Sequence, residues 1–381
     1  MDTLKSRRPY LLELDVMRVI LIIGVLLTHT QTTMENATDV DSVSRLIFNS
    51  THLMLHFTRM GFVFITGLVL IWHYYQRSFN WLSFWGRRYL RIGVPYFVWI
   101  SLYLVGILLI KQQSFANYGS RWLDTVLHGN QFYMYYLFMA AQLYLIFPLF
   151  CWLFERLGKY HTKILVASVV LQLVLVTVIK YVQPTQGNHP LLGIIFWHYG
   201  TDPLIYQLYF VLGAYCAVHY QRVTKWLDQY GHQLVGGAIV LSIMTIGLYQ
   251  FNLQVLHFGH HQSESIHQPF MMLMDVIMIL AVWWISRWYA NSRQQLRSWL
   301  HYSGQVSFGI YLMQTIMLGV LAGVLRLTTW PSWVYLVVTP VAFSIVFVGT
   351  YLLVVLLDRS TMLRPLVGLE FSKTKRQFKS Y

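Results

Sequence analysis

Residues 14–30 read LDVMRVILIIGVLLTHT, an apolar run that begins after Arg18 and ends at His29. About 20 predominantly apolar residues are enough for a helix to cross the hydrocarbon core of a membrane, and this run belongs to a stretch over residues 16–34. It lacks the pattern of a cleavable signal peptide, because Arg18 lies near its start and no small-x-small cleavage site follows it. We therefore expect a permanent membrane-spanning helix here.

Nine further apolar stretches follow the first one along the chain. Composition indicates the same class of protein, since 56% of the residues are hydrophobic, 17% aromatic and only 11% charged, which leaves too little polar surface for a soluble fold of this size. The sequence therefore predicts an all-α integral membrane protein, a bundle of about ten transmembrane helices. The expected spans lie near residues 16–34, 53–75, 92–110, 132–154, 164–182, 203–220, 234–251, 269–287, 305–325 and 333–357.

The distribution of the basic residues predicts the orientation of these spans. A net charge of +14 would suit a nucleic-acid-binding protein, but Lys and Arg lie in the gaps between apolar stretches rather than on one face of a soluble element. With the N-terminus inside, 21 of the 28 basic residues fall in inner segments, and the first outer loop is acidic. We expect both termini in the cytoplasm, a location in the plasma membrane with contacts to membrane lipids, and no nucleic-acid partner.

No segment outside the expected spans is long enough to form a soluble domain. The longest are an outer loop of about 20 residues after the first span and a tail of similar length after Asp358. The sequence thus predicts one membrane domain over residues 1–357 and a short basic cytoplasmic tail over residues 358–381. It contains no Walker, Rossmann or zinc-protease motif, which argues against ATP-driven transport by this chain alone.

Two ionisable residues of the first span are candidates for chemistry, because a charge within the membrane is costly and normally has a functional or pairing reason. Arg18 and His29 stand eleven positions apart, so on a helix they lie within roughly 20° of one face and about 16 Å apart along the axis. A purely structural role is the alternative for each. Arg18 would then reach the inner headgroups and pair with Asp15, and His29 would hydrogen-bond near the outer interface.

Five short blocks occur in order along the apolar stretches. They are LDVMR at 14–18 followed by ten residues and His29, RMGFVFITG at 59–67, RRYLRIGVPY at 87–96, QLYLIFP at 142–148 and SFGIYLMQ at 307–314. In this order they resemble the acyltransferase-3 family of membrane O-acyltransferases, in which an arginine and a histidine flank ten residues of the first span. The resemblance covers roughly residues 10 to 357. Thr66 stands where the family commonly has serine, and Gln314 where it often has histidine.

The resemblance implies transfer of an acyl group from acyl-CoA, with acetyl-CoA foremost, to a hydroxyl of a cell-envelope or extracellular saccharide. His29 is then the expected general base or, alternatively, a covalent carrier of the acyl group, because imidazole titrates near neutral pH. Arg18 is expected to supply electrostatic support, since its pKa excludes proton transfer. Neither a metal nor a further cofactor is assigned.

The remaining candidate residues are expected to bind the two substrates. Acyl-CoA carries phosphates, and a donor arriving from the cytoplasm would meet three arginines, which alternatively only set topology and bind anionic lipid. Asp15 would orient Arg18, while Gln314 can hydrogen-bond substrate but cannot titrate. Two tyrosines are possible hydroxyl contributors, with packing as the ordinary alternative. The donor-binding candidates are Arg87, Arg88 and Arg91, and the tyrosines are Tyr144 and Tyr311.

Two other groups of polar residues receive no role. An outer loop is rich in histidine, but its spacing matches no standard zinc site, so we assign no metal there. Asp275 is an intramembrane charge in the eighth span and is expected to pair with another polar group. The loop contains His257, His260, His261, Glu264 and His267.

Two other classes of function remain open at this point. The main alternative is a transporter or flippase for a polysaccharide or lipid-linked sugar, with the intramembrane ionisable residues as its path. A membrane sensor or scaffold without turnover is another. If the chain is an enzyme, it either acylates its acceptor directly or hands the acyl group to a separate extracellular transferase, because we expect no appended hydrolase-like domain after the spans.

Overall fold

The computed structural model describes residues 8–183, 196, 198–292 and 295–370, and it is helical with no strand in these ranges. A chain inside a bilayer must satisfy its backbone polar groups internally, and helices do so within one segment. The elements are α1 (Leu12–Glu35), α2 (Val43–Leu55), α3 (Phe57–Tyr74), α4 (Trp81–Ile110), α5 (Tyr118–His128), α6 (Tyr135–Arg156), η1 (Gly158–Tyr160), α7 (His161–Thr177), η2 (Val178–Val182), η4 (Pro203–Tyr206), α9 (Gln207–Val218), α10 (Tyr220–Gln254), α11 (His260–Ser263), α12 (Pro269–Ser292), α13 (Arg297–Leu325), α14 (Ser332–Arg359) and η5 (Arg364–Val367).

Eight helical segments in the described part of the chain are long and apolar enough to cross a membrane. The predicted all-α polytopic membrane fold is therefore confirmed. Helix α1 is not among the eight, and its first turns carry Glu13, Asp15 and Arg18. The helical segment Pro203–Val218 is apolar but shorter. The count of ten spans and the cytoplasmic placement of both termini stay predictions.

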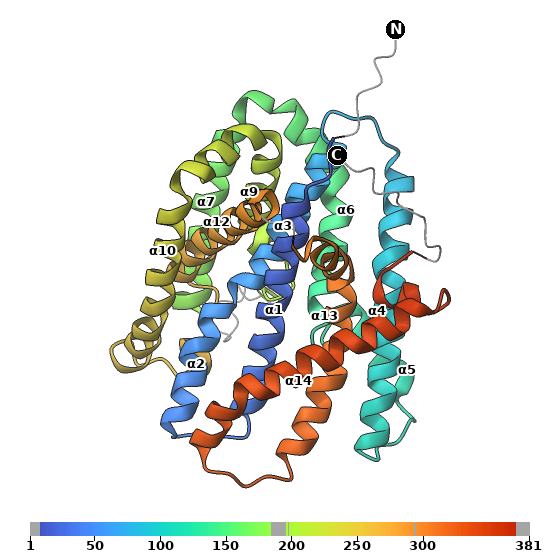
Figure 1. Cartoon of the computed structure of the whole chain (residues 1–381), viewed down its shortest axis with the longest axis vertical. Helices are drawn as coiled ribbons and strands as arrows, with labels where there is room; N and C mark the ends of the chain where they lie inside the picture. Colours follow the sequence, from blue (N-terminus) through green and yellow to red (C-terminus); the bar gives the residue numbers. More distant parts are fainter. Residues whose placement is uncertain (1–7, 184–195, 197, 293–294, 371–381) are drawn as a thin grey trace.

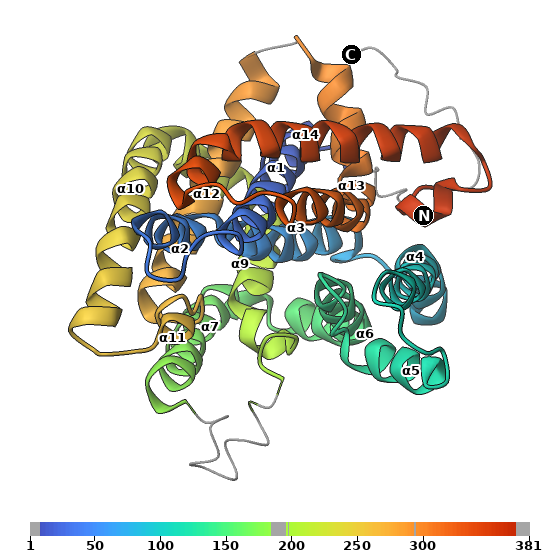
Figure 2. The same ribbon diagram turned by 90° about the horizontal axis from the view of Figure 1, so that it is seen from below.

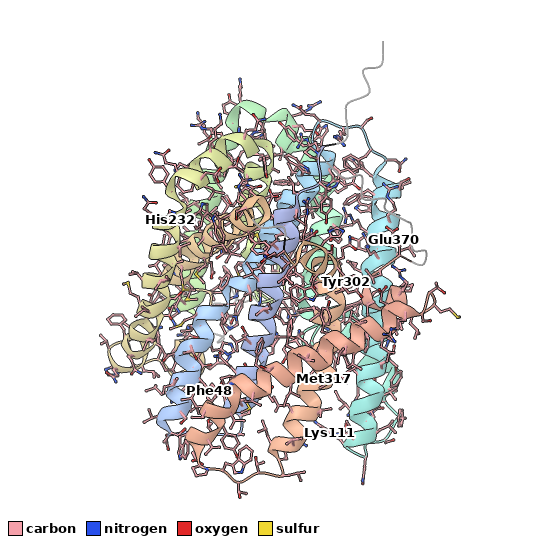
Figure 3. All side chains as sticks on the ribbon, in the orientation of Figure 1. Phe48, Lys111, His232, Tyr302, Met317 and Glu370 are labelled. Atoms are coloured by element: carbon pink, nitrogen blue, oxygen red, sulfur yellow. The ribbon has the colours of Figure 1, made fainter. Side chains whose placement is uncertain are left out.

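The helix connections gather at two opposite ends of the bundle. Figure 1 places the α3–α4, α6–α7 and α9–α10 connections at its upper end and the α1–α2, α4–α5 and α13–α14 connections at its lower end. In Figure 3, Lys111 at the end of α4 accordingly lies low, whereas Glu370 lies high. The distribution of the basic residues predicts that the connections at the upper end lie on the cytoplasmic side.

Two glycines bring α3 and α9 into close contact. A Cβ atom added to Gly67 would lie 2.2 Å from the carbonyl oxygen of Phe210, and one added to Gly213 would lie 2.1 Å from that of Phe64. Small residues at such crossings let backbones approach, which is a main source of helix association in membranes. Figure 2 shows α3 near the middle of the bundle, with α10 on one side and α4 and α5 on the other. This contact therefore fixes the central helix.

A third glycine sets the crossing of α1 and α13. A Cβ atom on Gly304 would lie 2.6 Å from the Cβ of Asp15, so only glycine allows this approach. The crossing places the start of α1, with its charged residues, against the first turns of α13. After α14, the chain folds back on α4, where the indole of Trp99 donates a hydrogen bond of 2.8 Å to the carbonyl of Leu366.

The substitution Gly213→Ala should lower the thermal unfolding midpoint of the purified protein in detergent. The added methyl group would overlap the backbone of α3, and overpacking of this kind costs about 1–3 kcal/mol. The matched control is Gly247→Ala in α10, where no atom lies within 4 Å of the added Cβ and alanine is the better helix former. Equal midpoints for the two variants would contradict the role of the α3–α9 contact.

Candidate active site

Two neighbouring cavities lie inside the bundle. The larger has a volume of about 760 Å³ and is bordered by α1, α3, α4, α6, α13 and the segment that follows α14. The smaller has a volume of about 30 Å³ and lies between α1, α3, α6 and α13. Phe62, Tyr136 and Tyr311 line both cavities. These three aromatic side chains therefore form a shared wall, which we call the aromatic wall.

The larger cavity has a strongly basic lining. Arg18, Arg88, Arg91 and Arg364 contribute to it, together with two histidines. Part of this charge is neutralised within the wall, because Arg364 Nε lies 3.3 Å from Asp358 and Arg91 Nη2 lies 3.5 Å from Glu370. Figure 3 labels Glu370 and Tyr302, which both line this cavity. The cavity thus presents cationic and aromatic groups to whatever enters it.

The three arginines of α4 have different surroundings. Arg88 and Arg91 are three residues apart, share one helix face and line the larger cavity, whereas Arg87 is exposed and does not line it. The guanidinium of Arg88 lies over the rings of Phe84 and Tyr144, at 5.8 and 5.5 Å from their centroids. Arg88 and Arg91 are therefore the two arginines of this helix that can meet a ligand in the cavity.

Arg18 belongs to a network centred on Asp15, whose side chain is fully buried. One carboxylate oxygen of Asp15 accepts a hydrogen bond of 2.8 Å from Arg18 Nη1. The other lies 2.7 Å from His301 Nδ1 and accepts a hydrogen bond from the Tyr10 hydroxyl. Gln305 is 2.9 Å from the second ring nitrogen of His301. Asp15 thus orients Arg18 at the wall of the larger cavity and joins α1 to α13.

His29 lines the smaller cavity. Its ring stacks on the ring of Tyr133, with centroids 3.6 Å apart and planes at 27°. No residue in the described ranges hydrogen-bonds to either of its ring nitrogens, so the imidazole is held by packing that includes this stacking. A histidine held in this way keeps both nitrogens available to a substrate.

Arg59 and three histidines join His29 in this region, and sequence reasoning assigned none of them to the site. Arg59 and His56 line the smaller cavity with His29. The imidazoles of His52 and His56 lie 4.5 Å apart, and His267 packs 5.7 Å from the ring of Tyr206. The signal available from sequence was the proximity of His52, His56 and Arg59 at one end of an apolar stretch.

Arg59 is held by aromatic residues rather than by a carboxylate. Its Nη1 donates a hydrogen bond of 3.1 Å to the hydroxyl of Tyr206, and its guanidinium lies 4.5 Å from the centroid of the Tyr135 ring. Within the part of the chain that the structure describes, no Asp or Glu forms an ion pair with it. The smaller cavity therefore contains a cation without a fixed counterion.

The other expected substrate-binding residues occupy different positions. Tyr144 lines the larger cavity and Tyr311 lines both, with its hydroxyl donating to the carbonyl of Tyr133. Gln314 is fully buried and lines neither cavity, and its amide nitrogen donates to the carbonyl of Tyr311 at 3.0 Å. Its side-chain oxygen has no hydrogen-bond partner among the described residues. Gln314 therefore holds the backbone of Tyr311 without reaching either cavity.

Asp275 and the histidine-rich loop line neither of the two cavities. Asp275 is fully buried and accepts a hydrogen bond of 2.9 Å from the Tyr209 hydroxyl. In the loop, His260 Nδ1 lies 2.9 Å from the hydroxyl of Tyr249. Among the described residues, no three His, Cys, Asp or Glu side chains are grouped in a way that could hold a metal ion.

The network around Asp15 should show strong energetic coupling. Asp15→Asn and His301→Gln each remove one partner of a buried charge-assisted contact, so each should lower the free energy of unfolding by about 1–3 kcal/mol. Because both single changes break the same contact, the double variant should be less destabilised than their sum, with a coupling energy of roughly 0.5–3 kcal/mol. Additive effects in denaturant titrations would contradict direct contact between the two side chains.

Comparison with known proteins identifies the family of this chain. The profile described as Acyltransferase domain (Acyl_transf_3) matches residues 11–359, which is almost the whole chain. Neither the curated proteins nor the solved structures give a match. The matched range begins just before α1 and ends with α14, so it includes the helices that form the two cavities. The chain therefore belongs to the acyltransferase-3 family of membrane acyltransferases.

Proposed function

We propose that this protein transfers an acyl group from cytoplasmic acyl-CoA to a hydroxyl of a cell-envelope saccharide. The observation that supports this proposal best is the pairing of a large basic cavity with a small cavity that contains His29. A donor with an anionic end and a reactive thioester end suits that pair, because the two ends need different surroundings. The acyl-CoA donor and the saccharide acceptor are those that the family resemblance implies.

The larger cavity suits the nucleotide part of the donor. Its volume of about 760 Å³ falls within the roughly 300–1,000 Å³ range of ligand pockets. Arg88 and Arg91 would contact phosphate oxygens, and the rings beside Arg88 would contact the apolar parts of the donor. Anionic lipid headgroups offer the same chemistry to these arginines, and a direct measurement of donor affinity distinguishes the two ligands.

His29 would act on the acceptor hydroxyl. In direct transfer, the acceptor oxygen bonds to the thioester carbonyl carbon while its proton passes to His29, and the C–S bond then breaks as the thiolate leaves and takes up that proton. In the covalent alternative, a ring nitrogen of His29 attacks the carbonyl carbon, and the C–S bond breaks as the thiolate leaves and takes up the proton of the other ring nitrogen. The acceptor oxygen then attacks the acyl-imidazole, the C–N bond breaks, and the acceptor proton returns to the imidazole. Both routes require a ring nitrogen free of other partners. The final acceptor is either the saccharide itself or a separate extracellular transferase.

The neighbouring residues would position the two substrates. Arg18, oriented by Asp15, adds positive charge to the wall of the donor cavity. Tyr144 and Tyr311 border the route from the donor phosphates to His29, and Gln314 fixes the backbone at Tyr311. We propose the substrate-side residues that the sequence suggested, except that Arg87 would have only a topological role, because it lines neither cavity.

The decisive test measures O-acylation of an envelope glycan by purified protein supplied with acetyl-CoA. His29→Ala should lower the turnover rate at least roughly 100-fold, because a positioned acid–base residue typically contributes that much or more. Mass spectrometry of the glycan quantifies the product. The control is His232→Ala in α10, a histidine that packs on Trp284 and lines neither cavity.

Two results of this assay would reject the proposal in different ways. Wild-type protein that yields no acylated glycan with any acyl-CoA, but moves glycan across a vesicle membrane, would be a transporter. Equal turnover by His29→Ala and wild type would leave the enzyme class in place and remove His29 from the catalytic step.

The arginines of α4 provide a matched pair for testing donor binding. Arg88→Gln should raise the KM for acyl-CoA roughly tenfold, since a charge-assisted hydrogen bond is worth about 1.5–3 kcal/mol. Arg87→Gln removes the same charge from the neighbouring exposed position and should leave KM within about twofold, because exposed charges contribute little. Steady-state kinetics with varied acyl-CoA measures both. Equal KM values for the two variants would show that Arg88 does not contact the donor.

A further inference from the structure

Arg59 is a cation for which the structure provides no permanent charge partner. It lies in the segment Val43–Tyr74, one of those apolar enough to cross the membrane. Protein surrounds the guanidinium, yet part of its surface remains accessible where it lines the smaller cavity. An unpaired charge in such surroundings is expensive and normally reflects a functional requirement. This free-energy cost is offset when a negative charge forms in that cavity.

The contacts of Arg59 fix its direction without neutralising it. The hydroxyl of Tyr206 donates its own proton to the carbonyl of Gly200 at 2.9 Å, which leaves the oxygen free to accept the hydrogen bond from Arg59. The ring of Tyr135 lies against the guanidinium as a cation–π partner. Both contacts orient the guanidinium, and neither brings a negative charge, so it is preorganised to receive one.

The charge of Arg59 acts on the buried carboxylate of Asp275, but only from a distance. Asp275 is oriented by the Tyr209 hydroxyl, which donates to one of its oxygens, and it forms no ion pair with Arg59. The other titratable side chains around Arg59 are the imidazoles of His29, His52, His56 and His267 and tyrosine hydroxyls. None of these is anionic near neutral pH.

The size of the smaller cavity restricts what the anion can be. One water molecule needs roughly 10–15 Å³ of this kind of volume, so about 30 Å³ accommodates only a few heavy atoms. A whole sugar ring or a phosphate ester exceeds that space, so a saccharide acceptor would enter it with its hydroxyl alone, whereas a carbonyl group with a short alkyl substituent is small enough. The atom that can bring negative charge next to both Arg59 and His29 is therefore the oxygen of the reacting acyl group.

We propose that Arg59 is a catalytic residue that stabilises the oxyanion formed on the acyl group during transfer. The proposal rests on the acyl-transfer function proposed above. As the nucleophile oxygen or nitrogen bonds to the carbonyl carbon, the π electron pair moves to the carbonyl oxygen, which becomes negative. Collapse of this intermediate restores the C=O bond and expels the thiolate. The oxyanion forms in both the direct and the covalent route, so the role of Arg59 is the same in each.

A purely structural role for Arg59 makes a different prediction. In that case the guanidinium would only connect α3 with η4 and α6, and its loss would lower stability and impair substrate binding and turnover together. An oxyanion-stabilising group acts only in the transition state, so its loss should lower kcat while leaving KM nearly unchanged. Removal of one oxyanion donor typically lowers kcat by about 100–1,000-fold.

The test compares kcat and the acyl-CoA KM of Arg59→Gln with those of wild-type protein in the glycan O-acylation assay. We expect kcat to fall about 100-fold or more with KM within about threefold. Arg59→Lys keeps the charge but loses the planar, directed donors, so its kcat should lie between those of wild type and Arg59→Gln. Arg45→Gln, which removes an outer arginine paired with Glu35, is the charge-matched control and should keep both constants near wild type.

Tyr206→Phe provides a second approach that keeps Arg59 in place. It removes the oxygen that directs the guanidinium, so kcat should fall by a smaller factor at unchanged KM. If Arg59→Gln does not fold, Arg59→Lys and Tyr206→Phe decide the question by the same comparison. Unchanged kcat in folded Arg59 variants, or a rise in KM at constant kcat, would overturn the role of Arg59 and leave the proposed function intact. Absence of product from wild-type protein would instead reject the proposed function itself.

Discussion

The cost of placing charge inside a membrane governs the arrangement of this protein. A charged side chain within the bundle can meet this cost by pairing with an opposite charge or by facing a cavity, because the surrounding medium cannot solvate it. Arg18 follows the first rule through its contact with buried Asp15. Arg59 follows the second, since it faces the smaller cavity and has aromatic neighbours instead of a carboxylate. The two arginines therefore differ in their surroundings although both come from apolar stretches.

Helix packing brings these charged residues together in one site. The tight crossing at Gly304 brings His301 of α13 to Asp15, so the orientation of Arg18 depends on a contact between residues nearly 290 positions apart in sequence. The contact of α3 with α9 likewise fixes the helix that carries Arg59 and Phe62. Small residues at helix crossings thus determine where the charged groups meet, although they carry no chemistry themselves.

The sequence predicts the membrane fold well because hydrophobicity and length dominate the choice of a spanning helix. It also predicts Arg18 and His29 as candidates, since an eleven-residue spacing on one helix and the family resemblance can both be recognised within one stretch. It does not distinguish Arg87 from Arg88, because their exposure depends on how α4 packs. It misses Arg59 as a site residue for a related reason: the absence of a counterion is a fact of three-dimensional surroundings and not of sequence neighbours.

The aromatic wall separates the proposed donor site from the proposed reaction site. In the proposed reaction, a donor held by Arg88 and Arg91 would present its thioester to His29 past the side chains that border both cavities, namely Phe62, Tyr136 and Tyr311. These rings stand between the small cavity and the larger basic one, and a low water content in the small cavity would strengthen the interaction between a guanidinium and a developing oxyanion. It also protects a reactive acyl group from hydrolysis. An uncompensated cation is therefore most useful on the far side of this wall, where the charge it stabilises exists only during the reaction.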